Sequence, residues 1–190
     1  MLPIGSFFGN IINRMDYSSS IPRTLVQKEY PMSESLVIFA DGGCKGNHKK
    51  GDREAYCSIS VRHGEKIIRI RPDWVKNFAG LDMAGPKEVL TIKLNKANTN
   101  NEAEFGAAIT ALGYVDELHR RNPNRPLPPI QIMMDSDLIV SAIKGDKKIK
   151  AKNLVGLLVT AGTIFNRLAG SLDLTISRIP RTDIETILGH

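Results

Sequence analysis

The sequence predicts a single α/β domain built around a buried sheet. Two short apolar runs rich in β-forming residues, at 36–40 and 130–134, are typical of strands buried on both faces. Apolar residues recur at helical spacing over 102–118 and 153–168, which predicts two helices with one buried face each. The 190 residues are enough for one filled core, because chains of this size bury roughly 70% of their unfolded surface.

Alternating patterns predict the remaining strands. Residues 55–61 and 66–70 alternate around a His-Gly-Glu turn, which predicts an antiparallel hairpin that continues the sheet. A short strand at 89–94 and a last strand at 172–179 follow the same pattern, and proline and glycine residues between 72 and 86 predict a loop insertion.

Capping residues predict where the helices begin and end. Asn100 or Asn101 is a natural N-cap for the first helix. Either Asp135 or Ser136 can cap a short helix over 137–144, which Gly145 closes. A capping box of Thr-Asp-Ile-Glu at 182–185 predicts a final short helix.

The first 34 residues differ in character from the rest. An apolar stripe near the N-terminus is followed by three serines and two prolines that interrupt any regular element. We therefore divide the chain into an N-terminal appendage, 1–34, and a domain, 35–190. The appendage is expected to pack on the domain or on a partner. An organelle-targeting peptide is the alternative, which Asp16 and the scarcity of arginine disfavour.

Composition limits the classes of partner and compartment. Lysine and arginine number 26 against 20 aspartates and glutamates, which predicts a positive field suited to phosphates. Two cysteines are too few for a disulfide framework, so an intracellular, reducing compartment is expected. No apolar run approaches the roughly 20 residues of a membrane-spanning helix, so no membrane association is expected. We expect a monomer.

Three acidic residues stand where a metal site can form. Asp41 and Asp135 follow the two buried strands, and Glu104 lies in the first turn of the long helix. Ligands of open α/β sheets bind outside the carboxyl ends of the strands, where such side chains converge. Crowded carboxylates repel one another unless a cation binds them, and oxygen donors suit Mg²⁺ or Mn²⁺. The alternative is that Asp41 only begins a glycine-rich turn and Asp135 only caps a helix.

The surrounding residues resemble the motifs of the type 1 ribonuclease H family across about residues 35 to 182. Three family patterns occur here in the family's order. The pattern Asp-Gly-x-Cys-x-Gly-Asn is matched by Asp41, Gly42, Cys44, Gly46 and Asn47, and Thr-Asn-Asn-x-x-Glu is matched by Thr99, Asn100, Asn101 and Glu104. The third pattern, a strand ending in Asp-Ser, is matched by Asp135 and Ser136.

The resemblance implies a ribonuclease H-like α/β fold, a mixed five-stranded sheet flanked by helices. It implies metal ligation by the three acids. It also implies contacts from Asn47, Thr99, Asn100 and Asn101 to the backbone of an RNA/DNA hybrid. Backbone groups around Gly42 to Cys44 are expected to sense ribose 2′-hydroxyls, which distinguish RNA from DNA.

The family normally adds a fourth acid from its C-terminal helix, and here the match fails. Ile179-Pro180-Arg181 fits the family pattern, but a gap-free alignment puts Leu188 at the position of the acid. Asp183 is our choice for the fourth catalytic and metal-binding residue, and Glu185 also lies near enough. The alternative is that both acids merely open a helix.

Five lysines crowd the link between the last two long helices: Lys144, Lys147, Lys148, Lys150 and Lys152. Some family members carry a basic protrusion there that grips the duplex. We expect Lys147 and Lys148 to contact phosphates, which gives affinity without sequence preference. A solvated face is the alternative.

The sequence therefore predicts a metal-dependent endoribonuclease that hydrolyses the RNA strand of RNA/DNA hybrids, using Mg²⁺ or Mn²⁺, two ions in all. A non-catalytic nucleic-acid-binding module with the same fold is the alternative, because of the uncertain fourth acid. Another nuclease on the same sheet is disfavoured by the Thr-Asn-Asn and Gly-Asn elements.

Overall fold

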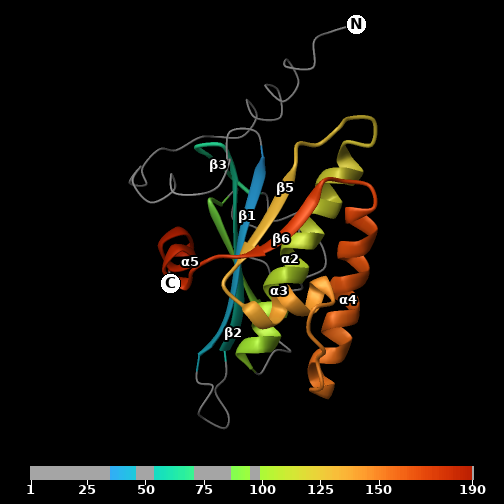
Figure 1. The fold of residues 1–190 in the computed structure, drawn as a ribbon. Coiled ribbons are helices and arrows are strands. Elements are labelled where there is room, and N and C mark those ends of the chain that lie inside the picture. The colour runs from blue at the N-terminus through green and yellow to red at the C-terminus, as the bar shows by residue number, and fades with distance from the viewer. Residues whose placement is uncertain (1–34, 46–53, 71–86, 95–98, 190) are drawn as a thin grey trace, which may run out of the picture.

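The computed structural model describes residues 35–45, 54–70, 87–94 and 99–189. These residues form a mixed sheet with helices on both faces (Figure 1). In chain order the elements are β1 (Leu36–Lys45), β2 (Glu54–His63), β3 (Lys66–Ile68), β4 (Val89–Leu94), α2 (Asn100–Arg121), β5 (Ile130–Met134), α3 (Asp137–Lys144), α4 (Lys152–Ala169), β6 (Leu174–Arg178) and α5 (Arg181–Leu188).

The sheet combines an antiparallel half with a parallel half. Its order is β3-β2-β1-β5-β6, with β4 also paired to β2. The pairs β1–β2, β2–β3 and β2–β4 are antiparallel, whereas β1–β5 and β5–β6 are parallel. Strands β3 and β4 pair with successive parts of β2, at 61–63 and 55–60. The expected mixed sheet is confirmed. It has six strands rather than five because two short strands share one position beside β2.

The main core lies between the sheet and the helices α2, α3 and α4, whereas α5 covers the opposite face (Figure 1). Alternate residues of the central strands face this core, among them Ile38, Ile59 and Ile132, each fully buried. The opposite face carries a smaller apolar cluster in which Phe39 of β1 packs with Ile184 of α5. The sheet is therefore covered by helices on both of its faces.

The predicted elements are present, and some of their boundaries shift. Strand β1 runs on to Lys45 instead of ending at residue 40, because β2 still pairs with it beyond that point. The second hairpin strand ends at Ile68, after which Ile70 forms an isolated bridge with Lys87. The last strand is shorter than predicted, at Leu174–Arg178. The predicted loop at 72–86, the appendage and Asn47 lie outside the described residues.

The helix caps were predicted correctly for α3 but not for α2 and α5. The hydroxyl of Ser136 accepts from the backbone N–H of Ile139 at 3.4 Å, and Gly145 ends α3 with φ 86°. The N-cap of α2 is Thr99, not Asn100 or Asn101. The capping box at 182–185 is wrong, because α5 already begins at Arg181 after Pro180, which places Thr182 within the first turn.

Thr99 and Glu102 form the capping interaction of α2. The hydroxyl of Thr99 accepts from the backbone N–H of Glu102 at 3.2 Å and donates to the Glu102 carboxylate at 3.1 Å. The amide of Asn153 donates to the same carboxylate at 3.0 Å, which joins the start of α4 to the start of α2. No helix within the described ranges is both long enough and apolar enough to span a bilayer.

We expect Thr99→Ala to lower the free energy of unfolding by about 1 kcal/mol, the usual cost of losing a helix N-cap. Chemical denaturation measures the change. Asn101→Ala is the matched control, because Asn101 is exposed in the first turn of the same helix, and its replacement is expected to cost less than about 0.5 kcal/mol. Equal costs for the two variants would contradict the cap assignment.

Candidate active site

Asp41 and Asp135 lie side by side where β1 and β5 separate. The parallel pairing of the two strands extends to Phe39 opposite Met133, and each acid stands two residues further along its strand or just beyond it. Asp135 directly follows β5, whereas Asp41 is still paired through β2, opposite Ser58. The carboxyl end of the parallel half of the sheet therefore carries both acids, as the sequence predicts.

Gly42 allows the first turn of α2 to lie directly against β1. A Cβ atom at Gly42 would be 2.1 Å from the carbonyl oxygen of Ala103 and 2.5 Å from the backbone nitrogen of Glu104. Only a residue without a side chain permits this approach. The contact joins Gly42, the neighbour of Asp41, to the backbone of Glu104, so the third acid is brought to the first two.

Ser136 joins the helix-borne acid to the end of β5. Its hydroxyl donates to the Glu104 carboxylate at 2.7 Å, and the same oxygen caps α3. The side chain of Ser136 therefore holds Glu104 beside Asp135, its neighbour in the chain. The sequence analysis named Ser136 only as a motif residue and a cap, and its bond to Glu104 was not foreseen.

The three carboxylates act on one another electrostatically. Burial raises the pKa of Glu104, the charges of Asp135 and Asp41 raise it further, and the hydrogen bond from Ser136 opposes the shift. Burial likewise raises the pKa of Asp135, followed by the charge of Asp41, and the guanidinium of Arg181 opposes both. A bound cation would reduce this repulsion between half-buried carboxylates.

The donor set has the chemistry of a site for a hard divalent ion. Three carboxylates supply oxygen ligands, which Mg²⁺ and Mn²⁺ prefer, and all three are only partly buried. As the side chains stand, no group of three or more acidic, histidine or cysteine residues within the described ranges is close enough to enclose an ion. The acids are neighbours, but they do not yet form a closed ligand set.

The motif asparagines and threonine stand at the start of α2. The side-chain oxygen of Asn100 accepts from the backbone N–H of Cys44 at 2.9 Å, which ties the glycine-rich end of β1 to the helix. Thr99 caps the helix, and Asn101 is exposed. Lys147 and Lys148 are exposed beyond α3, where Lys147 forms an ion pair with Asp137 at 3.0 Å.

A family comparison assigns the chain. The model of the RNase H family matches residues 33–190. The chain belongs to the RNase H family. It is thus a ribonuclease H-type hydrolase by family, and its mixed sheet flanked by helices is the RNase H-like fold that the sequence predicted.

Solved RNase H structures share this fold at low sequence identity. The N-terminal RNase H domain of a Mycobacterium tuberculosis protein, solved as a fusion with maltose-binding protein, has a TM-score of 0.51 and 24% identity, covering 79% of this chain and 85% of that one. RNase H1 from Halobacterium salinarum has a TM-score of 0.53 and 22% identity, covering 80% and 90%.

A third structure is LC11-RNase H1, which comes from compost by a metagenomic approach. It was solved in complex with an RNA/DNA hybrid and has a TM-score of 0.52 and 22% identity, covering 77% of this chain and 86% of that one. A comparison with curated protein sequences finds no match.

The C-terminal helix of this RNase H departs from the family pattern in its chemistry. Leu188, which aligns with the family's acid, is only 5% exposed and packs in the apolar cluster beneath α5. Asp183 is half-buried in the first turn of α5. The carboxylate of Glu185 instead accepts from Arg181 Nε at 2.7 Å. The structure therefore brings together Asp41, Glu104 and Asp135, whereas the hydrogen bonds described for Asp183 and Glu185 are to other residues of α5.

Two arginines beside the RNase H site were not singled out as site residues in the sequence. Arg178 donates from Nε to the backbone carbonyl of Asp135 at 3.1 Å. Arg181 lies close enough for its charge to oppose the raised pKa of Asp135 and Glu104. Both arginines flank the junction of β6 and α5. At this junction the backbone N–H of Ile179 donates to the carbonyl of Met134 at 2.8 Å, which attaches the junction to the end of β5. In the sequence, the positive charge of the Ile-Pro-Arg segment was the signal that could have indicated an arginine beside the site.

Proposed function

We propose that this RNase H is a metal-dependent endonuclease that hydrolyses the RNA strand of RNA/DNA hybrids. Asp41, Glu104 and Asp135 are the proposed ligands of two Mg²⁺ or Mn²⁺ ions. The observation that carries the proposal is the convergence of the three acids at one end of the sheet, where Gly42 lets Glu104 approach β1 and Ser136 holds the Glu104 carboxylate next to Asp135. Membership of the RNase H family supports the same reaction.

The side chains around the acids have distinct tasks in this proposal. Bound divalent ions supply an activated water and stabilise the developing charge on the leaving oxygen. Ser136 orients the Glu104 carboxylate through its 2.7 Å hydrogen bond. Arg178 holds the backbone at Asp135, and Gly42 keeps the start of α2 against β1. The product ends are a 3′-hydroxyl and a 5′-phosphate.

Hybrid recognition is proposed for the groups along the rim of the site. Backbone groups of Gly42 to Cys44 would face the RNA ribose in this proposal, and Thr99, Asn100 and Asn101 would contact the hybrid backbone. Asn47, outside the described residues, is proposed for the same task from the motif alone. Because Thr99 also caps α2 and Asn100 also binds Cys44 N–H, these two residues would position the rim as well as contact the substrate. Exposed Lys147 and Lys148 would contact phosphates. The hybrid complex of LC11-RNase H1 supports the substrate class.

Asp183 is the proposed fourth ligand. Its carboxylate accepts a hydrogen bond at 3.5 Å from Thr182, its neighbour in the chain, whereas Glu185 is occupied by the ion pair with Arg181 at 2.7 Å. Rotation of the Asp183 side chain would therefore break only a long hydrogen bond, whereas rotation of Glu185 would break an ion pair. This difference supports Asp183 over Glu185 as the residue that completes the site.

A non-catalytic module that binds hybrids is the second candidate function. The observation that favours it is Leu188, an apolar residue buried at the place where the family carries an acid. The basic surface and the fold would be retained, and only turnover would be lost. The two candidates differ in whether a divalent ion leads to cleavage.

Metal dependence of cleavage separates the two candidates. We expect the full chain to bind a labelled hybrid and to cut it in Mg²⁺ or Mn²⁺, with no cleavage in excess EDTA. A gel assay of the RNA strand reports cleavage, and fluorescence anisotropy reports binding. Binding without cleavage in either metal would identify the non-catalytic module. Absence of binding and cleavage would contradict both candidates.

A further inference from the structure

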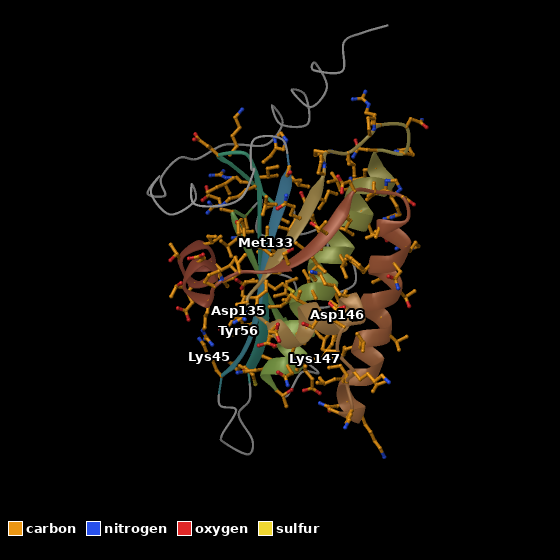
Figure 2. The ribbon with its side chains drawn as sticks, in the orientation of Figure 1. Lys45, Tyr56, Met133, Asp135, Asp146 and Lys147 are labelled. Carbon is orange, nitrogen blue, oxygen red and sulfur yellow. The ribbon has the colours of Figure 1, made fainter. Side chains whose placement is uncertain are left out.

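Tyr56 is an aromatic residue of the active-site end of the sheet that neither the motifs nor the proposed mechanism uses. It lies in the middle of three paired strands, opposite Gly43 of β1 on one side and Lys93 of β4 on the other. Its side chain is half-buried. Figure 2 shows Tyr56 at the same end of the sheet as Asp135 and Lys45.

The phenol ring of Tyr56 lies across β1 at Gly43. A Cβ atom at Gly43 would be 2.4 Å from the hydroxyl oxygen of Tyr56 and 2.6 Å from the ring carbon that bears it. The glycine therefore leaves the space that the end of the tyrosine occupies. Because alternate residues of a strand share a face, Gly43 and Asp41 lie on the same face of β1, which is the face that the ring of Tyr56 covers at Gly43.

Charge interactions agree with this placement. Burial raises the pKa of Tyr56, the charge of Asp41 raises it further, and the charge of Arg181 opposes the shift. The phenol thus lies within reach of one proposed metal ligand and of one arginine that flanks the site. A neutral phenol has a hydroxyl that can donate a hydrogen bond.

A packing role alone does not account for this arrangement. Among the described residues Tyr56 belongs to neither of the two apolar clusters, whereas Tyr114 is fully buried in the larger one. The ring instead crosses Gly43, and the charge of Asp41 acts on its hydroxyl. Exposed Lys45 adds positive charge at the same end of the sheet, which favours an anionic group there, whereas Lys93 and Arg181 are paired at 2.7 Å with Glu54 and Glu185.

We propose that Tyr56 is a further substrate contact, whose hydroxyl donates to a phosphate oxygen of the bound strand next to the bond that is cut. The inference rests on the proposed function, because it takes the three acids to mark the scissile bond. Gly43 is a positioning residue in this proposal, since it provides the space for the ring. Anionic phosphate oxygens are strong acceptors for such a donor.

Hybrid affinity in a cleavage-deficient background tests the contact. In Asp41→Asn protein we expect Tyr56→Phe to weaken hybrid binding about 10-fold, in line with the loss of one hydrogen bond to a charged group. Tyr114→Phe is the matched control, and we expect it to leave hybrid affinity unchanged. If the background protein binds hybrid and Tyr56→Phe binds equally well, the contact is overturned while the proposed function stands. If the background protein does not bind hybrid, the proposed function itself fails.

Single methylphosphonate linkages identify the acceptor. A neutral linkage in place of one phosphate near the cut should abolish the difference in hybrid affinity between the Tyr56 and Tyr56→Phe proteins. A 2′-deoxy substitution at the same nucleotide should leave that difference unchanged. The reverse pattern would overturn the phosphate assignment in favour of the ribose.

A double-mutant cycle tests the role of Gly43. Gly43→Ala should weaken binding by displacing the ring, but should have no further effect in Tyr56→Ala protein, where the space is open. Additive losses would show that Gly43 acts independently of Tyr56 and would overturn its positioning role.

Discussion

Gly42→Ala is expected to lower the free energy of unfolding by at least about 3 kcal/mol, the upper range for inserting an atom into a packed interior. The added Cβ would lie 2.1 Å from the oxygen and 2.2 Å from the carbon of the Ala103 carbonyl, and 2.5 Å from the Glu104 nitrogen. All three are backbone atoms of one helix, so no side chain can rotate to make room. Either α2 moves away from β1, or the protein unfolds.

Gly113→Ala provides the matched control. Gly113 lies in the same helix, and a Cβ there would meet no atom within 4 Å. Alanine at this position is expected to stabilise the protein by about 0.5–1 kcal/mol, because glycine is a poor helix former. Urea denaturation of both variants measures the contrast. A Gly42→Ala protein with wild-type stability would show that α2 does not lie against β1 as described.

Asp41→Asn is expected to have opposite effects on stability and on activity. Without divalent ions the variant should be more stable than the wild type by on the order of 0.5–1 kcal/mol, the scale of interactions between partly exposed charges. The reason is that the charge of Asp41 opposes ionisation of both Asp135 and Glu104. With Mg²⁺ the advantage should disappear, because the wild type gains a bound ion.

Cleavage by the Asp41→Asn protein should fall at least about 10³-fold, since the proposed ions supply several kcal/mol of transition-state stabilisation. Thermal unfolding with and without Mg²⁺, combined with the hybrid-cleavage rate, measures both effects. Asp173→Asn is the control, because Asp173 is exposed next to β6 at the opposite end of the parallel strands. A loss of stability in Asp41→Asn without metal would contradict the repulsion among the three acids.

Local patterns in the sequence were sufficient for most of the fold. Apolar runs and helical spacing located β1, β5, α2 and α4, because their buried faces dominate the composition of these segments. The position of two acids after buried strands also predicted their convergence. The resemblance to the ribonuclease H family was confirmed by the match of the RNase H model.

Features that depend on tertiary pairing were not predictable from the same patterns. Strand β1 continues past Asp41 because β2 pairs with it along its whole length. The cap of α2, by contrast, is a local feature that the sequence-based prediction missed: Thr99 and Glu102 have the Thr-x-x-Glu spacing of a capping box, and the two side chains are hydrogen-bonded in the structure.

The candidate site was predictable only in part for the same reason. Residues that lie far apart in sequence make its decisive contacts, such as Gly42 with Ala103 and Gly43 with Tyr56. Tyr56 occupies a strand position whose alternation indicated nothing beyond a half-buried side chain. Leu188 was visible as a departure from the family, but its burial beneath α5 required the structure.

Strand-resolved cleavage of a doubly labelled RNA/DNA hybrid tests the central claim most directly. With Mg²⁺ or Mn²⁺ we expect the wild-type chain to cut the RNA strand to products with 3′-hydroxyl and 5′-phosphate ends, and to leave the DNA strand and a matched DNA duplex intact. Asp41→Asn protein should leave both strands whole. An intact RNA strand after incubation with the wild-type protein and either metal, or equal cleavage by Asp41→Asn, would contradict the account.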